Sequence, residues 1–338
     1  MKHLPALALA LLAHTVDTSA APDPAALAGL AAGVWKVEVQ RPQGGYSFGS
    51  GMAVATDQVL TNCHVTHDGG AVHVLRGGRR WLADAQAVDA EHDLCVLRVP
   101  GLAATPVALG RGSELHPGQA VMAFGYTGGR ELQRSEGRIV ALHRLDGGRV
   151  IQSSNAFTSG ASGGGLFDEQ LRLVGILTFR LRGGAAHYFS APVEWLQPLG
   201  ADGGRFVDLR PGESDHPAYW QRAPEAQPNF LRAAVLERER RWDELEALAF
   251  NWTRVDADDP QPWYLHGLAL DALRRWPESQ RALERSLLLE PASQLALFRL
   301  GLVHAEQGQL DRARQLRAQL EGLQSELAGE LGRAIDTR

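Results

Sequence analysis

The chain has 338 residues, a formal net charge of -5 at pH 7 and 44% hydrophobic residues. A chain of this length and apolar content can form two domains, each with its own core. The charge balance is slightly acidic, and the arginine pairs stand among acidic residues. Because nucleic-acid binding typically requires a basic surface, we predict no nucleic-acid partner.

The first 20 residues carry the features of a secretory signal. Lys2 and His3 precede the apolar run Leu4–Ala13, and small residues follow at Thr18–Ala21. A run of about ten apolar residues suits a signal peptide and is too short to span a bilayer. We therefore predict a signal peptide over residues 1–20, a periplasmic or secreted protein, and no membrane span. An uncleaved anchor and a buried N-terminal helix are the alternatives for this segment.

From about residue 34 to residue 196 the sequence predicts short strands separated by turns. The expected strands are rich in Val, Ile, Leu and Phe, and glycine pairs separate many of them. They are Val34–Val39, Met52–Ala55, Val72–Leu75, Leu94–Val99, Ala120–Phe124, Arg138–Leu142, Val150–Gln152, Leu173–Phe179 and Tyr188–Ser190. Many short strands at such spacing indicate an all-β barrel or sandwich, and the absence of alternating long helices disfavours a parallel α/β sheet.

The composition then changes over residues 198–227, which are rich in Gly, Pro and charged residues. Such a composition predicts a linker between two domains. Its aromatic residues Phe206, Tyr219 and Trp220 are the candidates for ordered contacts.

The last part of the chain, residues 228–338, has a helical period and an internal repeat. Two series of residues recur every 34 positions: Trp242, Trp276 and Leu310, and Ala233, Gly267 and Gly301. This period is typical of the tetratricopeptide (TPR) repeat, a helix–turn–helix unit. We predict an all-α TPR-like domain of three repeats with a final capping helix; a generic helical bundle is the alternative.

Three short segments of the all-β half together carry the groups that acyl transfer requires: a nucleophile, a base, a group that orients the base, and donors for the oxyanion. They are Leu60–Val65 (LTNCHV), Glu91–Leu97 (EHDLCVL) and Ser159–Leu166 (SGASGGGL). Each alone has an ordinary explanation, as a core histidine, a turn aspartate or a flexible glycine loop. Together they offer His, Asp and Ser candidates beside predicted strands.

Taken together, the three segments resemble the trypsin-like serine proteases, above all the bacterial HtrA/Deg branch. That branch carries TNxHV, a DLAVL-like strand and GNSGGPL at matching places, and Gly49–Gly51 is similar to its entry into the first barrel. The likeness covers about residues 34–197. It implies a trypsin-like double β-barrel over residues 21–197 and hydrolysis of peptide bonds through an acyl-enzyme intermediate.

The resemblance assigns a role to each matching residue. Ser162 would be the nucleophile, His64 the general base and then the general acid, and Asp93 the group that orients the imidazole. The backbone N–H groups of Gly160 and Ser162 would form the oxyanion hole. Thr178 would support the buried aspartate. No cofactor and no metal are implied.

The sequence also departs from the family pattern. Ala161 replaces the usual Asn or Asp before the serine, so activation by insertion of a new N-terminus is not expected. Gly165 replaces the usual proline, which removes no catalytic atom. The helical repeats stand where HtrA proteins carry PDZ domains, so HtrA-style caging does not carry over.

By the family match, Ala156 and Phe157 line the pocket for the substrate's P1 residue, with Phe179 and His187 nearby. No acidic residue stands six positions before Ser162, where trypsin-like enzymes keep one for Arg or Lys. We therefore expect small or medium apolar P1 residues such as Ala, Val or Leu. An acidic P1 residue facing His187 is the alternative.

The two cysteines flank the candidate base and its partner. Cys63 precedes His64, and Cys95 lies two residues after Asp93. If His64 and Asp93 touch, their neighbours are close, and residues i and i+2 of a strand share a face. We predict a Cys63–Cys95 disulfide; two buried free thiols are the alternative.

Other functions remain open at this point. GASGG at residues 160–164 also fits the GxSxG motif of α/β-hydrolases, but the His and Asp candidates lie upstream, which disfavours an esterase. A TPR scaffold with an inactive protease domain is the main alternative, and His64 with His67 as a metal pair is a weak one. Expected partners are protein or peptide substrates and a protein bound in the TPR groove; alternatively, the repeats only stabilise the protease domain.

Overall fold

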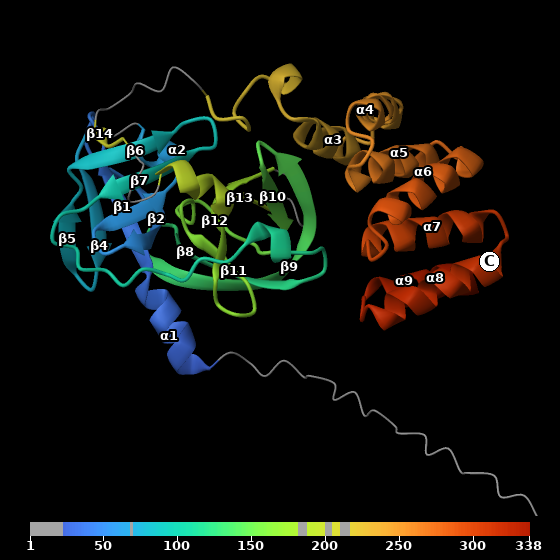
Figure 1. Ribbon diagram of the computed structural model, residues 1–338, viewed down its shortest axis with the longest axis horizontal. Helices are drawn as coiled ribbons and strands as arrows, with labels where there is room; N and C mark the ends of the chain where they lie inside the picture. The colour runs from blue at the N-terminus through green and yellow to red at the C-terminus, as the bar shows by residue number, and fades with distance from the viewer. Residues whose placement is uncertain (1–22, 68–69, 182–187, 200–204, 210–216) are drawn as a thin grey trace, which may run out of the picture.

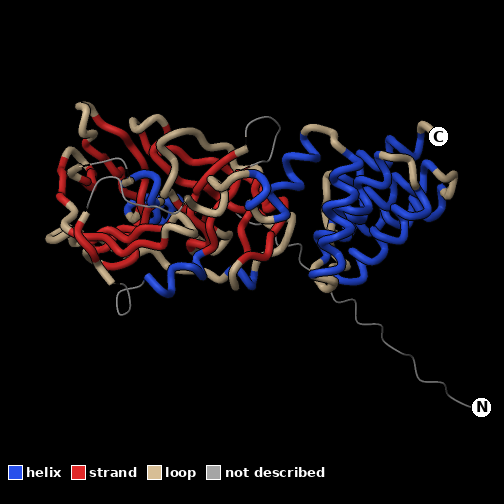
Figure 2. The backbone as a smooth tube through the Cα atoms, turned by 90° about the horizontal axis from the view of Figure 1, so that it is seen from above, coloured by secondary structure: helices blue, strands red, loops and turns tan. Residues whose placement is uncertain are grey.

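The computed structural model describes residues 23–67, 70–181, 188–199, 205–209 and 217–338. The predicted signal segment and His187 therefore lie outside the described residues. A β-rich lobe and a helical lobe lie side by side, as two views at right angles show (Figures 1 and 2). The first described element is the helix α1 (Pro24–Ala32), which leads into the first strand.

The first part of the β-rich lobe is an eight-stranded sheet in the order β14-β6-β7-β3-β2-β1-β4-β5. Neighbouring strands are antiparallel, and valine and leucine side chains fill its inner face. The strands are β1 (Val34–Gln40), β2 (Tyr46–Ala55), β3 (Gln58–Thr61), β4 (Val72–Arg76), β5 (Arg79–Leu82), β6 (Ala85–Asp89), β7 (Leu94–Arg98) and β14 (Val207–Asp208).

The second part is a closed six-stranded barrel in the order β10-β13-β12-β11-β8-β9. Its strands are β8 (Ala120–Thr127), β9 (Glu131–Leu145), β10 (Gly148–Ser153), β11 (Gly165–Phe167), β12 (Leu173–Arg180) and β13 (Tyr188–Pro192). All nine strands predicted from the sequence are observed, with ends shifted by a few residues. The predicted two-barrel, trypsin-like architecture is confirmed, although among the described strands hydrogen bonds close only the second barrel.

The predicted linker follows the first sheet wherever the structure describes it. After the 3-10 helix Val193–Leu199, the short strand β14 adds to the edge of that sheet by pairing with β6. Farther on, Tyr219 is buried, and its N–H donates to the carbonyl of Glu91 at 3.0 Å. These parts of the segment are therefore packed against the β-rich lobe rather than tethered loosely to it.

The helical lobe consists of three helix pairs and a last helix within residues 217–338. The helices are α3 (Asn229–Arg238), α4 (Trp242–Val255), α5 (Pro260–Ala272), α6 (Trp276–Leu289), α7 (Gln294–Glu306), α8 (Leu310–Gly322) and α9 (Leu327–Asp336). The second helix of each pair begins at Trp242, Trp276 or Leu310, so the 34-residue period of the sequence is also the period of the fold.

The repeat also fixes the backbone between paired helices. Arg240, Arg274 and Gly308 occupy equivalent turns, with φ values of +57°, +59° and +73°. Within the pairs, small residues allow close packing: a Cβ placed on Gly267 would lie 2.6 Å from Cγ of Leu283. The repeated residues are therefore those that set the turn and the approach of the two helices.

The two lobes share one hydrophobic cluster that runs from both sheets into α3, α4 and α5. At the contact, the ring of His143 on β9 stacks on Phe230 of α3, with 4.4 Å between ring centroids and 9° between planes. His143 Nδ1 lies 2.5 Å from Nε2 of Gln261 on α5. Beside this contact, a cleft of about 770 Å³ lies between β9 and β10 on one side and α3, α5, α7 and α9 on the other.

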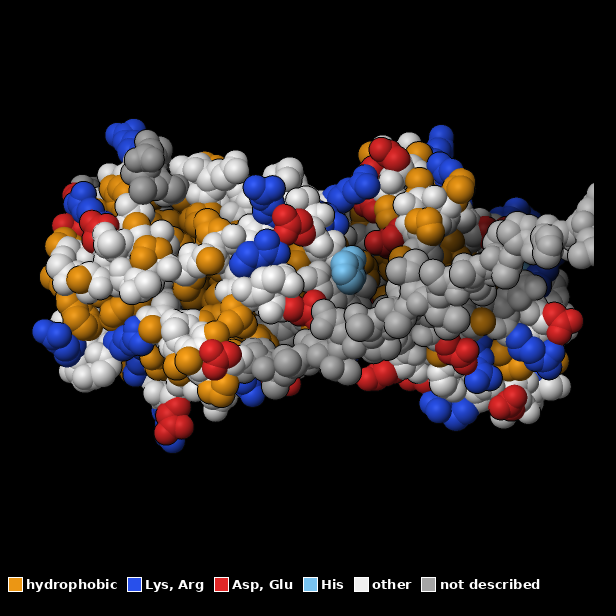
Figure 3. Space-filling model, turned by 60° about the horizontal axis from the view of Figure 1, so that its bottom comes forward, with side chains coloured by type: hydrophobic (Ala, Val, Ile, Leu, Met, Phe, Trp, Pro, Cys, Tyr) orange, Lys and Arg blue, Asp and Glu red, His pale blue; other side chains and the backbone are white. Residues whose placement is uncertain are grey.

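Charged side chains of both signs are interspersed on the face of the molecule in Figure 3, and apolar side chains gather over the β-rich lobe. Of the helices that the structure describes, none is both long enough and apolar enough to cross a membrane.

Candidate active site

Asp93 lies in the turn between β6 and β7, at the edge where the two sheets meet. Its backbone has a φ of +59°, a left-handed conformation that is unfavourable for a residue with a side chain. Two donors hold that conformation through the Asp93 carbonyl: the N–H of Cys63 at 3.2 Å and Nδ2 of Asn62 at 2.9 Å. The carboxylate is 2% exposed, so it is turned into the protein.

His64 is carried by the one-turn helix α2 (Cys63–Thr66), which directly follows β3. Its Nδ1 lies 2.6 Å from Oδ2 of Asp93, and its backbone N–H donates to Oδ1 of the same carboxylate at 2.8 Å. The carboxylate therefore fixes the imidazole at two points. Because Nδ1 faces Asp93, the other ring nitrogen is left to face solvent and Ser162, and the side chain is 27% exposed.

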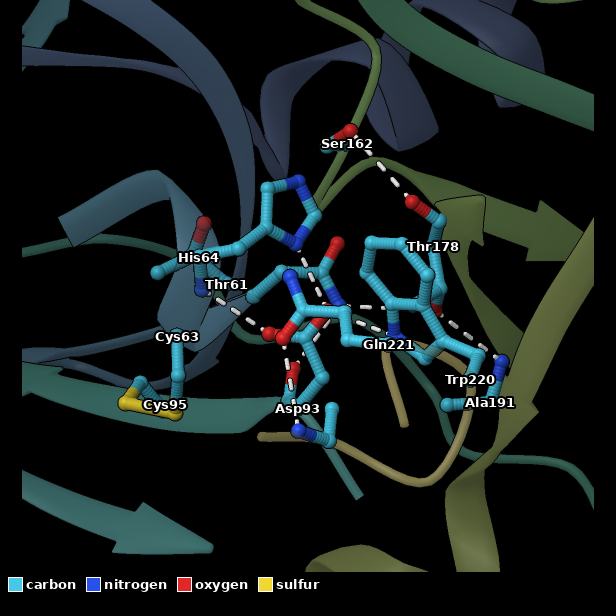
Figure 4. A network of polar contacts seen from close by, with 12 residues as sticks. Thr61, Cys63, His64, Asp93, Cys95, Ser162, Thr178, Ala191, Trp220 and Gln221 are labelled. Carbon is cyan, nitrogen blue, oxygen red and sulfur yellow. Dashed lines mark hydrogen bonds and ion pairs between the residues drawn. A yellow bond between two sulfur atoms is a disulfide. The ribbon is translucent and has the colours of Figure 1, made fainter. Parts of the chain in front are cut away.

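Ser162 lies in the turn before β11, on the other side of the imidazole from Asp93 (Figure 4). Its hydroxyl donates a long hydrogen bond of 3.4 Å to the carbonyl of Thr178. Within the described residues, the Ser162 hydroxyl and the His64 imidazole form no hydrogen bond with each other. The structure thus brings the three predicted residues to one place, with a direct contact between His64 and Asp93, while the Ser162 hydroxyl is bonded to Thr178.

The turn that carries Ser162 contains the two backbone N–H groups predicted as oxyanion donors, those of Gly160 and Ser162. The carbonyl of Ser159 accepts a hydrogen bond from the N–H of Gly128 at 2.7 Å. Because a trans peptide points its C=O and N–H in opposite directions, the N–H of Gly160 is turned away from Gly128. Within the described part of the chain, neither this N–H nor that of Ser162 has an acceptor. Two unpaired donors beside a hydroxyl form a site for a developing oxyanion.

Ser50 on β2 holds this turn from the first sheet, which the sequence analysis did not predict. Its hydroxyl donates to the carbonyl of Gly160 at 2.8 Å and accepts from the N–H of Tyr126 at 2.8 Å. Its own N–H donates to the carbonyl of Ser162 at 2.7 Å. The only signal in the sequence was the Gly-Ser-Gly segment at residues 49–51, which the resemblance linked to the entry into the first barrel.

Thr178 is linked to Asp93 through a third residue, Asn62. Its hydroxyl donates to the carbonyl of Ile176 at 2.8 Å and accepts from the Asn62 amide and the Ala191 N–H, each at 3.3 Å. It therefore reaches Asp93 only through Asn62, whose amide also contacts the Asp93 carbonyl. The support predicted for the buried aspartate thus passes through Asn62, because the threonine hydroxyl donates to a carbonyl of its own strand.

The indole of Trp220 takes the place expected for that support. Its Nε1 donates to Oδ2 of Asp93 at 3.2 Å, from a position 127 residues farther along the chain. Nothing in the local pattern marked this tryptophan beyond its being an aromatic residue in a Gly- and Pro-rich segment.

The residues predicted to line the P1 pocket do not share one cavity. Ala156 is exposed, and with Phe157 it borders a cavity of about 30 Å³ that has room for a single water molecule. Phe179 does not border that cavity: it is 6% exposed and lies between Phe189 at 4.8 Å and Trp220 at 4.9 Å. The prediction placed Phe179 near substrate, whereas the stacked rings cover it. The fourth predicted residue, His187, is outside the described ranges.

Cys63 and Cys95 are joined by a disulfide, with their Cα atoms 4.9 Å apart. The bond links α2, which carries His64, to β7, which begins directly after Asp93. It thus ties together the two segments that place the imidazole and its carboxylate.

A second histidine and aspartate pair lies in the same lobe. His92 Nδ1 is 2.6 Å from Asp89, its Nε2 is 3.2 Å from Asp146, and its ring stacks on Trp195 at 4.0 Å. Burial opposes the charged form, but the two carboxylates raise the pKa of His92 above its ordinary value. Since both ring nitrogens are engaged, we interpret this pair as structural.

An imidazole held by a buried carboxylate, a serine beside unpaired N–H groups and two packed β-sheets together define a trypsin-like peptidase domain. Residues 49–176 match the family of trypsin-like peptidase domains. The chain therefore carries a domain of this class, followed by the helical lobe.

Relatives of the β-rich lobe are HtrA- and DegP-like proteases. A probable periplasmic serine endoprotease of the DegP-like type from Chlamydia trachomatis is 30% identical over 158 residues, which cover 44% of this chain and 32% of the relative. A protein of the same description from Hahella chejuensis is 36% identical over 141 residues, which cover 40% of this chain and 30% of that relative. The chain thus spans about a third of the length of these relatives.

Among solved structures, the Rv3671c protease of Mycobacterium tuberculosis in its active form superposes with a TM-score of 0.50 at 24% identity. The match covers 59% of this chain and 92% of that protein. This likeness concerns the fold.

Proposed function

We propose that the chain is a serine endopeptidase in which Ser162 attacks the peptide carbonyl, His64 transfers the proton and Asp93 orients and stabilises the imidazolium. The observation that carries this proposal is the 2.6 Å contact between His64 Nδ1 and Asp93 Oδ2, placed beside a serine with two unpaired backbone donors. Acyl transfer needs these groups at one point, and here three distant segments supply them.

The first half of the reaction forms an acyl-enzyme. The Ser162 hydroxyl turns from Thr178 toward His64, which takes its proton as Oγ bonds to the carbonyl carbon. The N–H groups of Gly160 and Ser162 receive the negative charge that develops on the carbonyl oxygen. His64 then gives the proton to the leaving amine as the peptide bond breaks.

The second half returns the enzyme to its resting state. His64 takes a proton from water as the water oxygen attacks the acyl carbon, and gives it back to Ser162 Oγ as the ester bond breaks. Buried Asp93 holds Nδ1 of His64 and stabilises the imidazolium in both halves.

We also propose export to the periplasm or beyond the cell. Three observations support it: the charged and apolar N-terminal sequence, the disulfide beside the site, and the periplasmic description of the relatives. Fractionation of expressing cells, with a variant lacking residues 2–20, tests this location.

For the helical lobe we propose TPR-like repeats that bind a protein or peptide in the cleft facing β9 and β10. The 34-residue period of the helix pairs and the cleft of about 770 Å³ support this role. The alternative is that the repeats only stabilise the peptidase domain. A peptide array probed with the full chain and with Phe298→Glu, whose side chain lines the cleft, separates the two roles.

Reaction with a fluorophosphonate probe tests the catalytic proposal directly. Wild-type protein should be labelled on Ser162, Ser162→Ala should not be labelled, and His64→Ala and Asp93→Asn should be labelled much more slowly. An unreactive, folded wild-type protein would instead support the alternative of an inactive, protease-like scaffold.

A further inference from the structure

Trp220 contacts the candidate catalytic pair from outside the matched peptidase domain. It belongs to the segment that leads from the β-rich lobe to α3, and it is half-buried. Its indole N–H donates at 3.2 Å to Oδ2 of Asp93, the same oxygen that contacts His64 Nδ1 at 2.6 Å. The strength of one hydrogen bond to a shared acceptor oxygen depends on the other.

The indole ring also covers one side of the imidazole. Its plane is nearly perpendicular to the His64 ring, at 83°, with centroids 5.6 Å apart (Figure 4). The indole also stacks on Phe179, with centroids 4.9 Å apart and 10° between the planes. Phe179 follows Thr178, the residue whose carbonyl accepts from Ser162. The tryptophan therefore walls the space next to the reacting groups with an apolar surface.

The position of Trp220 is held from both ends of its segment. On one side, the backbone N–H of Tyr219 donates to the Glu91 carbonyl at 3.0 Å, and the Arg222 side chain forms an ion pair with the Glu91 carboxylate. On the other, the Gln227 amide donates to the carbonyls of Trp220 and Arg222 at 3.0 and 2.9 Å, two residues before α3 begins. The segment is thus clamped to the turn that carries Asp93 and to the start of the helical lobe.

We propose that Trp220 is a positioning residue for the Asp93–His64 pair and the wall of the subsite for the substrate's P2 residue. The inference rests on the proposed peptidase function. Its N–H takes part of the carboxylate's charge and holds Oδ2 in place for the imidazole. We infer that a substrate whose scissile carbonyl lies between Ser162 and the unpaired N–H groups has its P2 side chain beside His64, facing the apolar indole, and that this wall favours small or flat apolar P2 groups.

Two variants separate the two roles. Trp220→Phe keeps a flat ring against Phe179 but lacks the N–H, whereas Trp220→Ala lacks both. Trp263→Phe is the matched control, because its indole N–H also donates to an oxygen, the Ala257 carbonyl at 3.0 Å, within the helical lobe. The probes are a fluorophosphonate and a series of peptidyl diphenyl phosphonates that differ only at P2.

For Trp220→Phe we expect the acidic limb of the labelling-rate profile to move to higher pH by about half a unit, because Oδ2 of Asp93 then accepts from the imidazole without competition from the indole. The P2 preference should stay as in wild type. For Trp220→Ala we expect the same shift. In addition, the labelling rate of phosphonates with bulky P2 residues, relative to those with small P2 residues, should rise about tenfold. Trp263→Phe should match wild type in both measurements.

The outcomes distinguish this inference from the function on which it rests. If wild-type protein labels but Trp220→Phe has the pH profile of Trp263→Phe, and Trp220→Ala keeps the wild-type P2 order, the inference is wrong and the peptidase function stands. If folded wild-type protein does not label at all, both are wrong.

Discussion

The hydroxyl of Ser50 donates a hydrogen bond at 2.8 Å to the carbonyl of Gly160, 110 residues farther along the chain. The first sheet thereby holds the turn that carries the unpaired N–H groups of Gly160 and Ser162. Because the N–H of Tyr126 donates to the same hydroxyl, Ser50 links its own strand β2 to β8 and to the turn that precedes β11.

Ser50→Ala should lower kcat/KM about tenfold, since the Gly160–Ala161 peptide, which lies between the two unpaired N–H groups, loses the bond that holds it, and should lower the free energy of unfolding by about 1 kcal/mol. Peptide hydrolysis and urea unfolding measure the two effects. The control is Ser153→Ala, which removes a buried serine hydroxyl that has no partner in the barrel. Equal activity of the two variants would contradict the role of Ser50.

Gly160→Ala should abolish activity. The φ of Gly160 is +95°, and a Cβ there would overlap the carbonyl oxygen of Tyr126, so the turn must change shape. Gly44→Ala is the matched control: its φ is +93°, and a Cβ there would meet nothing within 4 Å. We expect the control to be less stable by about 1 kcal/mol and to keep its full activity. A Gly160→Ala variant as active as the control would show that the turn is not part of the site.

Loss of the Cys63–Cys95 disulfide should destabilise the protein by about 3–4 kcal/mol, because the bond closes a long loop in the unfolded chain. The expected activity of Cys63→Ala/Cys95→Ala is also lower, since only hydrogen bonds then hold the segment with His64 against the turn with Asp93. These are the only two cysteines of the chain, so thiol counting on unreduced, unfolded protein reports on this bond alone. Two free thiols per chain would exclude it.

The packing of the two lobes should weaken in acid. Burial lowers the pKa of His143, whose ring stacks on Phe230, below the ordinary value of 6.5. The folded protein therefore binds this proton more weakly than the unfolded chain, and the contribution of His143 is fully present above about pH 6.5 and lost as the pH falls below it.

The test is the urea midpoint at pH 7.5 and at pH 5.5 for wild type and His143→Phe. We expect the variant, which keeps the stacking but cannot be protonated, to be less stable at pH 7.5 and to show a smaller fall in acid. His116→Phe, at an exposed histidine, serves as the control. An unchanged pH dependence in His143→Phe would contradict the assignment.

The sequence was sufficient to predict those features of the fold and site that depend on local or periodic patterns of residues. Strand-length apolar runs and the 34-residue period predicted both lobes, since these patterns follow from burial on one face of a strand or helix. The three segments with His64, Asp93 and Ser162 were recognisable because their side chains and flanking glycines are short motifs.

What the sequence did not predict depends on contacts between distant segments. Trp220 reaches Asp93 because its segment packs along the first sheet, and that packing also covers Phe179, which was expected to be near substrate. Ser50 was seen only as part of a glycine-rich motif, because its role depends on a turn of the second barrel. Thr178 was assigned to Asp93, but pairing within its own sheet decides its bonds.

The bond between Ser50 and Gly160 also bears on how the chain folds. Contacts between residues so far apart form late, because the entropy of closing a long loop must be overcome first. A partly folded molecule in which only one sheet has formed therefore lacks the bond from Ser50 that holds the turn around Ser162. On the proposed function, a newly made chain therefore gains activity only once the first sheet and the second barrel have packed together. In refolding, recovery of tryptophan fluorescence should precede recovery of probe reactivity.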